Sequence, residues 1–208
     1  LPNFFLVGDA TAAGWSENNN NTPLFRDGTN PDLYSYTGRF AGGAAVEGFK
    51  LLENLGSWQP QWGVKDGALT NSTILGEDPG AFKVAADAYY TLTMDVDAMT
   101  YSFEPYDASA AATYATIGVI GDSTADGWDA DQDMTKSTFD PHIWYVKGIE
   151  LGDGEMKFRA DNAWDVNWGG TTAMSGQASI NGPNIPVTAG TYDIWFNDIT
   201  GRYLLIKQ

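Results

Sequence analysis

The chain of 208 residues carries a net charge of −16 at pH 7 and only 11 Lys and Arg residues, which excludes the clustered cations of a nucleic-acid-binding surface. It has no cysteine, which excludes a disulfide framework, a thiolate metal site and a cysteine nucleophile. The 24 Gly and 9 Pro residues, spread among many Thr, Tyr, Phe and Val residues, favour short strands and turns over helices. No apolar run reaches the length of a membrane span.

Taken in chain order, four segments of the first half return in the second half in the same order and with similar spacing. The pairs are FFLVGDATAAGW (4–15) with TIGVIGDSTADGW (116–128), LYSYTGRF (33–40) with IWYVKGIE (143–150), FKLLENLGSWQPQWG (49–63) with MKFRADNAWDVNWGG (156–170), and YYTLTMDVDAMTYSF (89–103) with TYDIWFNDITGRYLL (191–205). A tandem duplication explains this self-similarity. We therefore predict a domain over residues 1–105, an alanine-rich linker over 106–115, and a second domain over 116–208 that repeats the first.

Strands within each copy follow from an alternation of apolar and polar residues. Tyr90, Leu92 and Met94 alternate with polar residues, and the segment 191–196 does the same in the second copy. A period of two predicts one buried face and one solvated face. About seven such strands in roughly a hundred residues, without a long helical period, are typical of an Ig-like sandwich. The predicted fold class is all-β, with two tandem Ig-like antiparallel β-sandwich domains.

Two of the eight tryptophans differ from the others in their surroundings. Trp144 lies in the apolar run IWYV, so we expect it in the core. Trp195 alternates out of phase with Ile194 and Phe196, which leaves it either in the core or facing solvent.

The remaining six tryptophans form three aligned pairs, each beside Gly, Asn, Asp, Gln or Pro. The pairs are Trp15 with Trp128, Trp58 with Trp164, and Trp62 with Trp168. Large rings in polar, glycine-rich surroundings favour a role in binding, so we predict that at least two per copy are exposed. The alternative is that one tryptophan of each triplet, the one before the final glycine, attaches its loop to the core.

Polar side chains beside these rings complete the composition of a sugar site. A sugar ring has an apolar C–H face, which flat aromatic rings contact, and a rim of hydroxyls, which amides and charged groups bond. Candidates for the rim are Lys50, Glu53, Asn54 and Gln61 in the first copy and Lys157, Arg159, Asp161, Asn162 and Asn167 in the second. Lys50 and Lys157 align with one another, and the alternative for both is an ordinary lysine on a strand surface.

Four motifs follow one another along the chain: GDAT-x-x-GW, a Lys between apolar residues, (D/N)-x-x-W-x-x-x-WG, and a terminal Tyr-containing hairpin. This combination resembles the SusE/SusF starch-binding lipoproteins of Bacteroidota. The resemblance covers both copies. It implies non-catalytic tandem Ig-like modules in which an arc of aromatic rings, supported by a basic or amide side chain, binds α-glucan. The ligand-binding residues are then Trp15, Lys50, Asn54, Trp58 and Trp62 in the first copy, and Trp128, Lys157, Arg159, Asn162, Trp164, Asn167 and Trp168 in the second.

The same resemblance implies the partners and the location. The expected ligand is a neutral polysaccharide such as starch, glycogen or maltooligosaccharides, with β-glucan or mannan as alternatives. The expected location is the outer-membrane surface facing the medium, in association with a glycan-uptake complex. The lipidated cysteine and leading domain of that family are not in this sequence, so we expect a trimmed chain whose only link to the membrane is an anchor outside it.

An enzyme is the first competing class. A glycosidase needs two carboxylates at a set separation across a cleft. Asp9 and Asp122 are the clearest acid kept in both copies, and each follows a glycine in a predicted turn, which favours a turn residue. His142, the only histidine, has no counterpart in the first copy, which argues against a catalytic triad or a histidine-rich metal site. We predict no catalytic residue, no cofactor and no metal.

A calcium-dependent adhesion module is the second competing class. Asp129, Asp131 and Asp133 have the first three spacings of a calcium-binding loop. Met134 takes the position where that loop needs glycine, and Asp140 takes the position where glutamate is usual. We therefore favour an acidic, solvated loop.

Overall fold

The computed structural model describes residues 1–208 and is built almost entirely from strands, which confirms the all-β prediction. Its one helix, α1 (Ser72–Leu75), is four residues long. No helix has the length and apolar character needed to cross a bilayer. The chain divides into two compact units, one of Leu1–Arg26 with Pro31–Ala108 and the other of Asp27–Asn30 with Ser109–Gln208.

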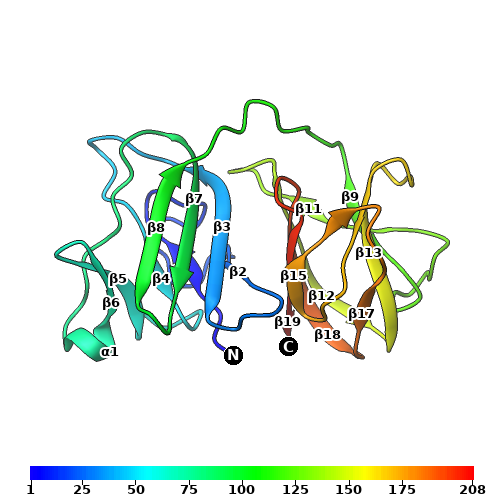
Figure 1. The fold of residues 1–208 in the computed structure, drawn as a ribbon, viewed down its shortest axis with the longest axis horizontal. Helices are drawn as coiled ribbons and strands as arrows, with labels where there is room; N and C mark the ends of the chain where they lie inside the picture. The colour runs from blue at the N-terminus through cyan, green and yellow to red at the C-terminus, as the bar shows by residue number, and fades with distance from the viewer. The chain divides into compact units, whose positions relative to one another are not determined.

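The first unit consists of two four-stranded antiparallel sheets (Figure 1). One sheet has the order β1-β4-β5-β6, with β1 (Phe5–Val7), β4 (Lys50–Leu52), β5 (Gln61–Lys65) and β6 (Ala68–Asn71). The other has the order β2-β3-β7-β8, with β2 (Phe25–Arg26), β3 (Leu33–Phe40), β7 (Ala88–Asp95) and β8 (Thr100–Pro105).

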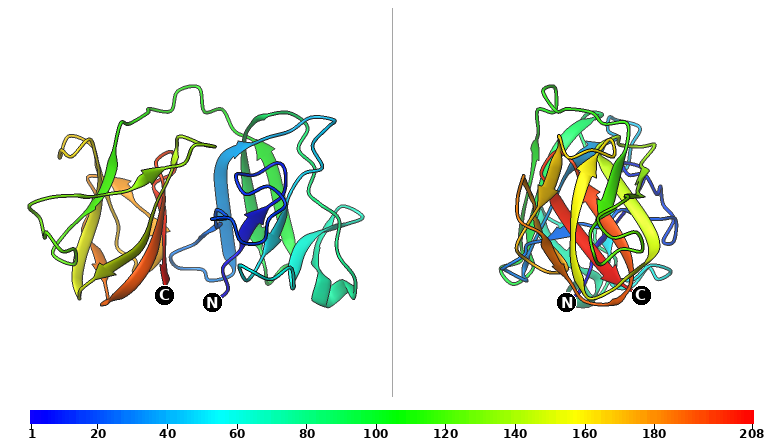
Figure 2. Two further views of the ribbon diagram at one scale, coloured as in Figure 1. Left: turned by 180° about the vertical axis from the view of Figure 1, so that it is seen from behind. Right: turned by 90° about the vertical axis from the view of Figure 1, so that its right-hand side faces the viewer.

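The second unit has the same architecture with additional strands (Figure 2). Its first sheet has the order β10-β9-β13-β14-β16, with β10 (Gln132–Asp133), β9 (Ile117–Ile120), β13 (Gly154–Ala160), β14 (Asn167–Gly169) and β16 (Ser179–Ile180), and β17 (Ile185–Val187) also pairs with β13. Its second sheet has the order β11-β12-β18-β19-β15, with β11 (Thr135–Lys136), β12 (Ile143–Leu151), β18 (Gly190–Asn197), β19 (Arg202–Lys207) and β15 (Ser175–Gln177).

The strand order repeats between the units as the sequence repeats. The order β1-β4-β5-β6 corresponds to β9-β13-β14-β16, and β2-β3-β7-β8 corresponds to β11-β12-β18-β19. One difference is that β15 pairs with the outer side of β19, whereas β8 is the last strand of its sheet.

The core of the first unit lies on the alternating apolar face of its strands. Tyr90, Leu92 and Met94 of β7 are all buried, as their period of two predicts. Tyr90 stacks on Phe103 of β8 with ring centroids 4.5 Å apart, and Phe40 of β3 meets Phe103 edge-on at 5.1 Å. Burial of such side chains contributes about 1.5–3 kcal/mol each, so this face holds the two sheets together.

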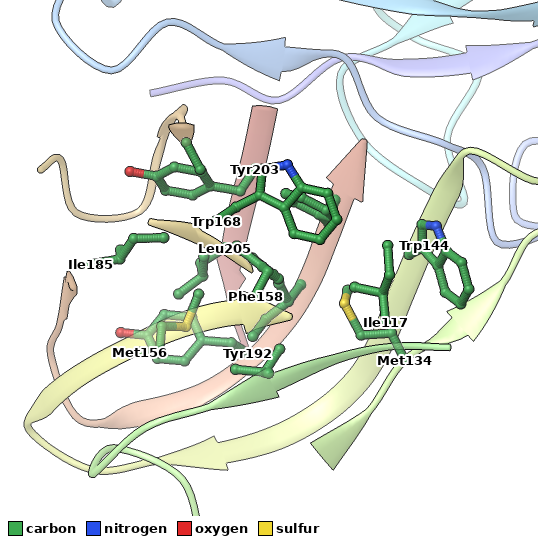
Figure 3. Close-up of a cluster of buried hydrophobic side chains, with 14 of the residues drawn as sticks. Ile117, Met134, Trp144, Met156, Phe158, Trp168, Ile185, Tyr192, Tyr203 and Leu205 are labelled. Carbon is green, nitrogen blue, oxygen red and sulfur yellow. The ribbon is translucent and has the colours of Figure 1, made fainter. Parts of the chain in front are cut away.

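Aromatic rings also fill the core of the second unit (Figure 3). Phe158 of β13 stacks on Phe196 of β18 with centroids 4.2 Å apart, and Trp168 of β14 meets Phe196 at 5.1 Å. Trp144 is buried, so its assignment to the core is confirmed.

Trp195 is only 1% exposed, so the solvent-facing alternative is wrong. Trp195 does lie out of phase with the core, because the core cluster contains its neighbours Ile194 and Phe196 but not Trp195. It pairs with Tyr145 of β12 on one side and with Leu204 of β19 on the other. The ring of Tyr145 lies 5.0 Å away, and the ammonium of Lys147 lies 4.8 Å from the indole centroid. Strand phase therefore predicted the side of the sheet correctly, but neighbouring side chains on that side decided the exposure.

Candidate functional site

The site begins at a glycine turn that both units share. Gly8 and Gly121 have positive φ angles of 133° and 155°, and their N–H groups donate to the carbonyls of Gly14 and Gly127 at 2.8 and 3.2 Å. A β-carbon at Gly8 would lie 2.3 Å from the carbonyl oxygen of Gly48, so only glycine fits. The turn is therefore held closely against the chain that leads into β4, and it ends at an exposed tryptophan.

A carboxylate fixes the same turn from its other side. Asp9 accepts hydrogen bonds from the N–H groups of Glu47 and Gly48, both at 2.9 Å, and Asp122 accepts one from the N–H of Glu155 at 2.7 Å. Both aspartates act as turn residues, as predicted. They connect the tryptophan-bearing turn to the strand that carries the aligned lysine.

Each unit brings two tryptophans together outside its core, both exposed in the second unit and one exposed in the first. Trp15 is 36% exposed, and its ring centroid lies 6.5 Å from that of the half-buried Trp58, with the planes tilted by 32°. Trp128 and Trp164 are 37% and 45% exposed, with centroids 6.0 Å apart and planes tilted by 37°. We call each of these two-ring surfaces a tryptophan pair. Exposed rings grouped in this way are typical of a binding surface.

The third tryptophan of each copy lies in the core, so its predicted contact with a ligand is corrected. Trp62 is 6% exposed and Trp168 is 4% exposed. The indole N–H of Trp62 donates to Glu53 at 2.8 Å, and its ring meets Phe4 edge-on at 5.2 Å. The alternative of a tryptophan that attaches its loop to the core is the correct one. The reason is that these rings lie on the inward face of β5 and β14, whereas Trp58 and Trp164 precede those strands.

A buried amide holds the exposed tryptophan in both units. Gln61 donates from Nε2 to the carbonyl of Trp58 at 3.3 Å, and Asn167 donates from Nδ2 to the carbonyl of Trp164 at 2.9 Å. The two residues align in sequence, and both are buried. The predicted contact of Asn167 with a ligand is therefore corrected to a supporting hydrogen bond beneath Trp164.

The aligned lysines lie beside the tryptophan pairs. Lys50 donates from Nζ to Oε1 of Gln61 at 2.6 Å, and the ammonium of Lys157 lies 5.8 Å from the ring centroid of Trp164. Partial burial lowers the pKa of both lysines, because it removes water from the ammonium. Each unit thus combines a tryptophan pair with one donor cation.

Arg159 belongs to the support of the second tryptophan pair. Its guanidinium lies 4.8 Å from the ring centroid of Trp164, and its Nε lies 2.5 Å from Oδ1 of Asp131. The side chain of Arg159 is mostly buried and that of Asp131 is fully buried, and this burial raises the pKa of Asp131. The predicted ligand contact is corrected, because Asp131 neutralises the cation and Trp164 covers it.

The two predicted asparagines form hydrogen bonds away from the tryptophan pairs. Asn162 donates from Nδ2 to the hydroxyl of Thr116 at 3.3 Å. Asn54 is exposed in the turn before Trp58, and its carbonyl accepts from the N–H of Ser57 at 3.3 Å. These bonds do not join either residue to a tryptophan pair.

In the first unit the tryptophan pair borders a cleft of about 450 Å³. Its lining residues are Trp15, Glu47, Lys50, Trp58, Gln59, Gln61, Asp78, Gly80 and Ala81. Sequence reasoning missed Glu47, Gln59 and Asp78. Gln59 donates from Nε2 to Oδ1 of Asp78 at 2.9 Å. This bond joins the loop that carries Trp58 to a segment of the first copy that has no match in the second copy. The acceptors and donors of this cleft can bond hydroxyl groups.

A metal site does not form at the predicted acidic loop. Asp131 is bound to Arg159, while Asp129 is exposed. No group of three or more His, Cys, Asp or Glu side chains is placed to hold a metal ion.

Comparisons with known proteins identify a similar solved structure but no matching family. No protein-family model and no curated protein match the chain. A solved structure, that of SusF from Bacteroides thetaiotaomicron, matches at 15% sequence identity with a TM-score of 0.38, covering 98% of this chain and 47% of that chain. The chain therefore spans about half the length of the structure it matches.

Proposed function

We propose that the chain is a non-catalytic carbohydrate-binding protein that captures a neutral polysaccharide on the tryptophan pair of each unit. The observation that carries this proposal is the recurrence, in both units, of two neighbouring indole rings, at least one of them exposed, beside an aligned lysine. Indole faces suit the C–H faces of sugar rings, and the lysine suits a hydroxyl oxygen. The cleft of the first unit supplies further hydroxyl partners in Gln59 and Asp78.

The tilt of the rings favours an α-glucan such as starch, glycogen or a maltooligosaccharide. The two planes of a tryptophan pair differ by 32° in the first unit and by 37° in the second. An α-1,4-linked chain turns from one glucose to the next, so two successive glucose rings can each lie flat on one of two indole rings that are tilted relative to one another. A flat β-1,4-linked chain fits coplanar aromatic rings better. The motif resemblance to starch-binding lipoproteins supports the same ligand.

That resemblance also supports a location for the protein. We propose that it works at the outer-membrane surface, held there by a lipid anchor and associated with a complex that takes up glycan. The low number of Lys and Arg residues fits a ligand that is neither nucleic acid nor another polyanion.

Stacking on two rings predicts weak binding by each unit. If each tryptophan removes roughly 80–100 Å² of apolar surface from water, two rings contribute ~4–5 kcal/mol before the costs of ordering and desolvation. That corresponds to dissociation constants of about 0.2–1 mM at the tightest. A polymer that reaches both units gains from the higher effective concentration of the second contact.

Affinity electrophoresis in gels containing glycogen, amylopectin, β-glucan or mannan tests the proposal. We expect retardation by glycogen and amylopectin, and its loss in a variant that carries both Trp58→Ala and Trp164→Ala. Tyr106→Ala is the matched control, because Tyr106 is also an exposed aromatic residue but lies outside both pairs.

Other results of the same experiment would change the proposal. Retardation only by β-glucan or mannan would keep the module and reject α-glucan. Loss of retardation in excess chelator would favour calcium-dependent adhesion, and release of reducing sugar by the pure protein would reject a non-catalytic role.

A further inference from the structure

In the second unit an added strand completes the edge of a sheet. β15 pairs antiparallel with β19, placing Ser175 opposite Leu204, Gly176 opposite Tyr203 and Gln177 opposite Arg202. The N–H of Leu205 donates to the carbonyl of Met174 at 2.7 Å and extends this pairing by one bond. The backbone groups of Tyr203 and Leu205 that point away from β18 are therefore satisfied by β15.

The corresponding edge in the first unit is open. β8 aligns with β19, with Tyr101 at the place of Tyr203 and Phe103 at the place of Leu205. β8 pairs with β7 on one side and is the last strand of its sheet (Figure 1). The N–H of Tyr106 donates to the carbonyl of Tyr89 at 2.9 Å, so the backbone groups of Tyr106 point toward the β7 side. Backbone groups point to alternate sides along an antiparallel strand, so those of Tyr101 and Phe103 point away from β7.

A groove runs along that open edge. It has a volume of about 510 Å³ and is lined by Val64, Gly67, Phe82, Lys83 and residues 101–104. Four consecutive residues of β8 form one wall, the β5–β6 hairpin forms another, and the buried ring of Phe82 contributes an apolar surface. Pro105 has no N–H, so the outward donors are those of Tyr101 and Phe103. The open length thus matches the three residues of β15.

We propose that the β8 edge binds an extended segment of a partner protein as an added antiparallel strand. The second unit shows which strand fits this edge, since β15 is short and has glycine at its centre. There, a β-carbon on Gly176 would lie 2.2 Å from the hydroxyl oxygen of Thr172 and 2.8 Å from that of Tyr203, and Tyr101 occupies the position of Tyr203 in the first unit. The partner segment therefore has a glycine or another small residue at its centre.

Charge decides between a partner segment and a second copy of this chain. The chain carries a net charge of −16. The groove holds two exposed charged residues, Glu104 of β8 and Lys83, and the ammonium of Lys83 donates to the carbonyl of Glu47 at 2.9 Å. Two copies would repel one another, whereas a segment with basic flanks would be attracted. The occupant is thus a short, extended polypeptide with a small central residue and basic flanks.

The probe for this proposal is a peptide of residues 171–180 of this chain, TTAMSGQASI, with one added lysine at each end. It is titrated into the full, isotope-labelled chain and followed by NMR. We expect shifts concentrated at the amides of residues 101–104, and slower hydrogen exchange at Tyr101 and Phe103. The same peptide with sarcosine in place of Gly176 lacks one backbone donor and should bind about fivefold more weakly. The chain variant Glu104→Lys should also weaken binding, mostly at low salt.

Three results would overturn the proposal. The first is that the sarcosine peptide binds as tightly as the glycine peptide, and the second is that the NMR shifts lie mainly outside β8. The third is that Tyr101 and Phe103 are protected from hydrogen exchange without peptide in a sample that sediments as a dimer, which would make a second copy the occupant. Retardation by glycogen in the presence of saturating peptide is measured alongside. It reports on the tryptophan pairs and so separates a failure of this proposal from a failure of glycan binding.

Discussion

At the scale of single residues, aligned tryptophans have different roles within one triplet. Trp58 precedes β5 and is half-buried, whereas Trp62 lies on the strand and faces the core. Gln61, between them, is buried and holds the carbonyl of Trp58. A few residues of one loop thus contain a ring outside the core, its support and an attachment to the core.

This division predicts opposite effects for two alanine substitutions. Trp58→Ala should remove glycan binding by the first unit and change the free energy of unfolding by less than about 1 kcal/mol, because the ring is partly exposed. Trp62→Ala should lower the free energy of unfolding by ~3–5 kcal/mol, since it empties a buried site and leaves Glu53 without its indole partner. Chemical denaturation and affinity electrophoresis of both variants check this. A strongly destabilised Trp58→Ala would contradict it.

A second residue-scale prediction concerns pH and Asp198. Its carboxylate accepts from the indole N–H of Trp144 at 2.8 Å and lies 2.7 Å from Nδ1 of His142. Burial raises its pKa to about 6, despite the lowering effect of both hydrogen bonds. A carboxyl whose pKa is raised by folding stabilises the fold below its unfolded pKa of 3.8, and this contribution is lost as pH rises through about 6.

The measurement is the free energy of unfolding of the second unit, compared between the wild type and Asp198→Asn. The asparagine has no proton to lose. The difference in free energy of unfolding, wild type minus variant, should therefore fall by at most ~3 kcal/mol between about pH 4 and about pH 7. The subtraction removes the effect of the other acids. A difference that stays constant or rises with pH would show that the pKa is not raised.

At the scale of elements, the glycine turn positions one ring of each tryptophan pair. Its geometry depends on the positive φ of Gly8 and on the close contact with Gly48. Asp9 adds two hydrogen bonds to the same connection. The turn and the start of β4 therefore behave as one element, and the position of Trp15 depends on it.

Gly8→Ala should lower the free energy of unfolding by ~1–3 kcal/mol and weaken glycan binding by the first unit. The added methyl group meets the carbonyl of Gly48, and an L-residue resists this backbone angle. Ala12→Gly is the matched control, because Ala12 is exposed in the same turn. Unfolding and binding curves of the two variants are compared. If Gly8→Ala leaves both unchanged, the turn does not position Trp15.

At the scale of the whole molecule, the strong negative charge of the chain plays no part in the proposed stacking of sugar on the tryptophan pairs. The net charge is −16, whereas each tryptophan pair presents indole rings beside one lysine: Lys50 donates to Gln61 at 2.6 Å, and Lys157 lies 5.8 Å from the ring centroid of Trp164. Each unit has its own core and its own tryptophan pair, and the strand order of the two units corresponds.

Binding of a neutral glycan should therefore depend little on salt. Raising the ionic strength from about 0.01 M to about 1 M shortens the screening length from roughly 30 Å to roughly 3 Å. We expect the dissociation constant for maltooligosaccharides, measured by calorimetry, to change less than about twofold over this range. A steep loss of affinity would indicate an anionic ligand.

The sequence alone determined the fold class, the repeated strand pattern, two exposed tryptophans in the second copy but one in the first, and the turn role of Asp9. These features follow from local patterns, namely a period of two, a repeated spacing, and glycine followed by a carboxylate. Only the tertiary structure decided which tryptophan of each triplet enters the core, because that depends on where β5 and β14 begin relative to the loop. It also decided that Arg159 is covered by Trp164 and neutralised by Asp131, a pairing between residues 28 positions apart. The open edge of β8 likewise became visible only beside the filled edge of β19, since strand pairing is a long-range property that no local pattern records.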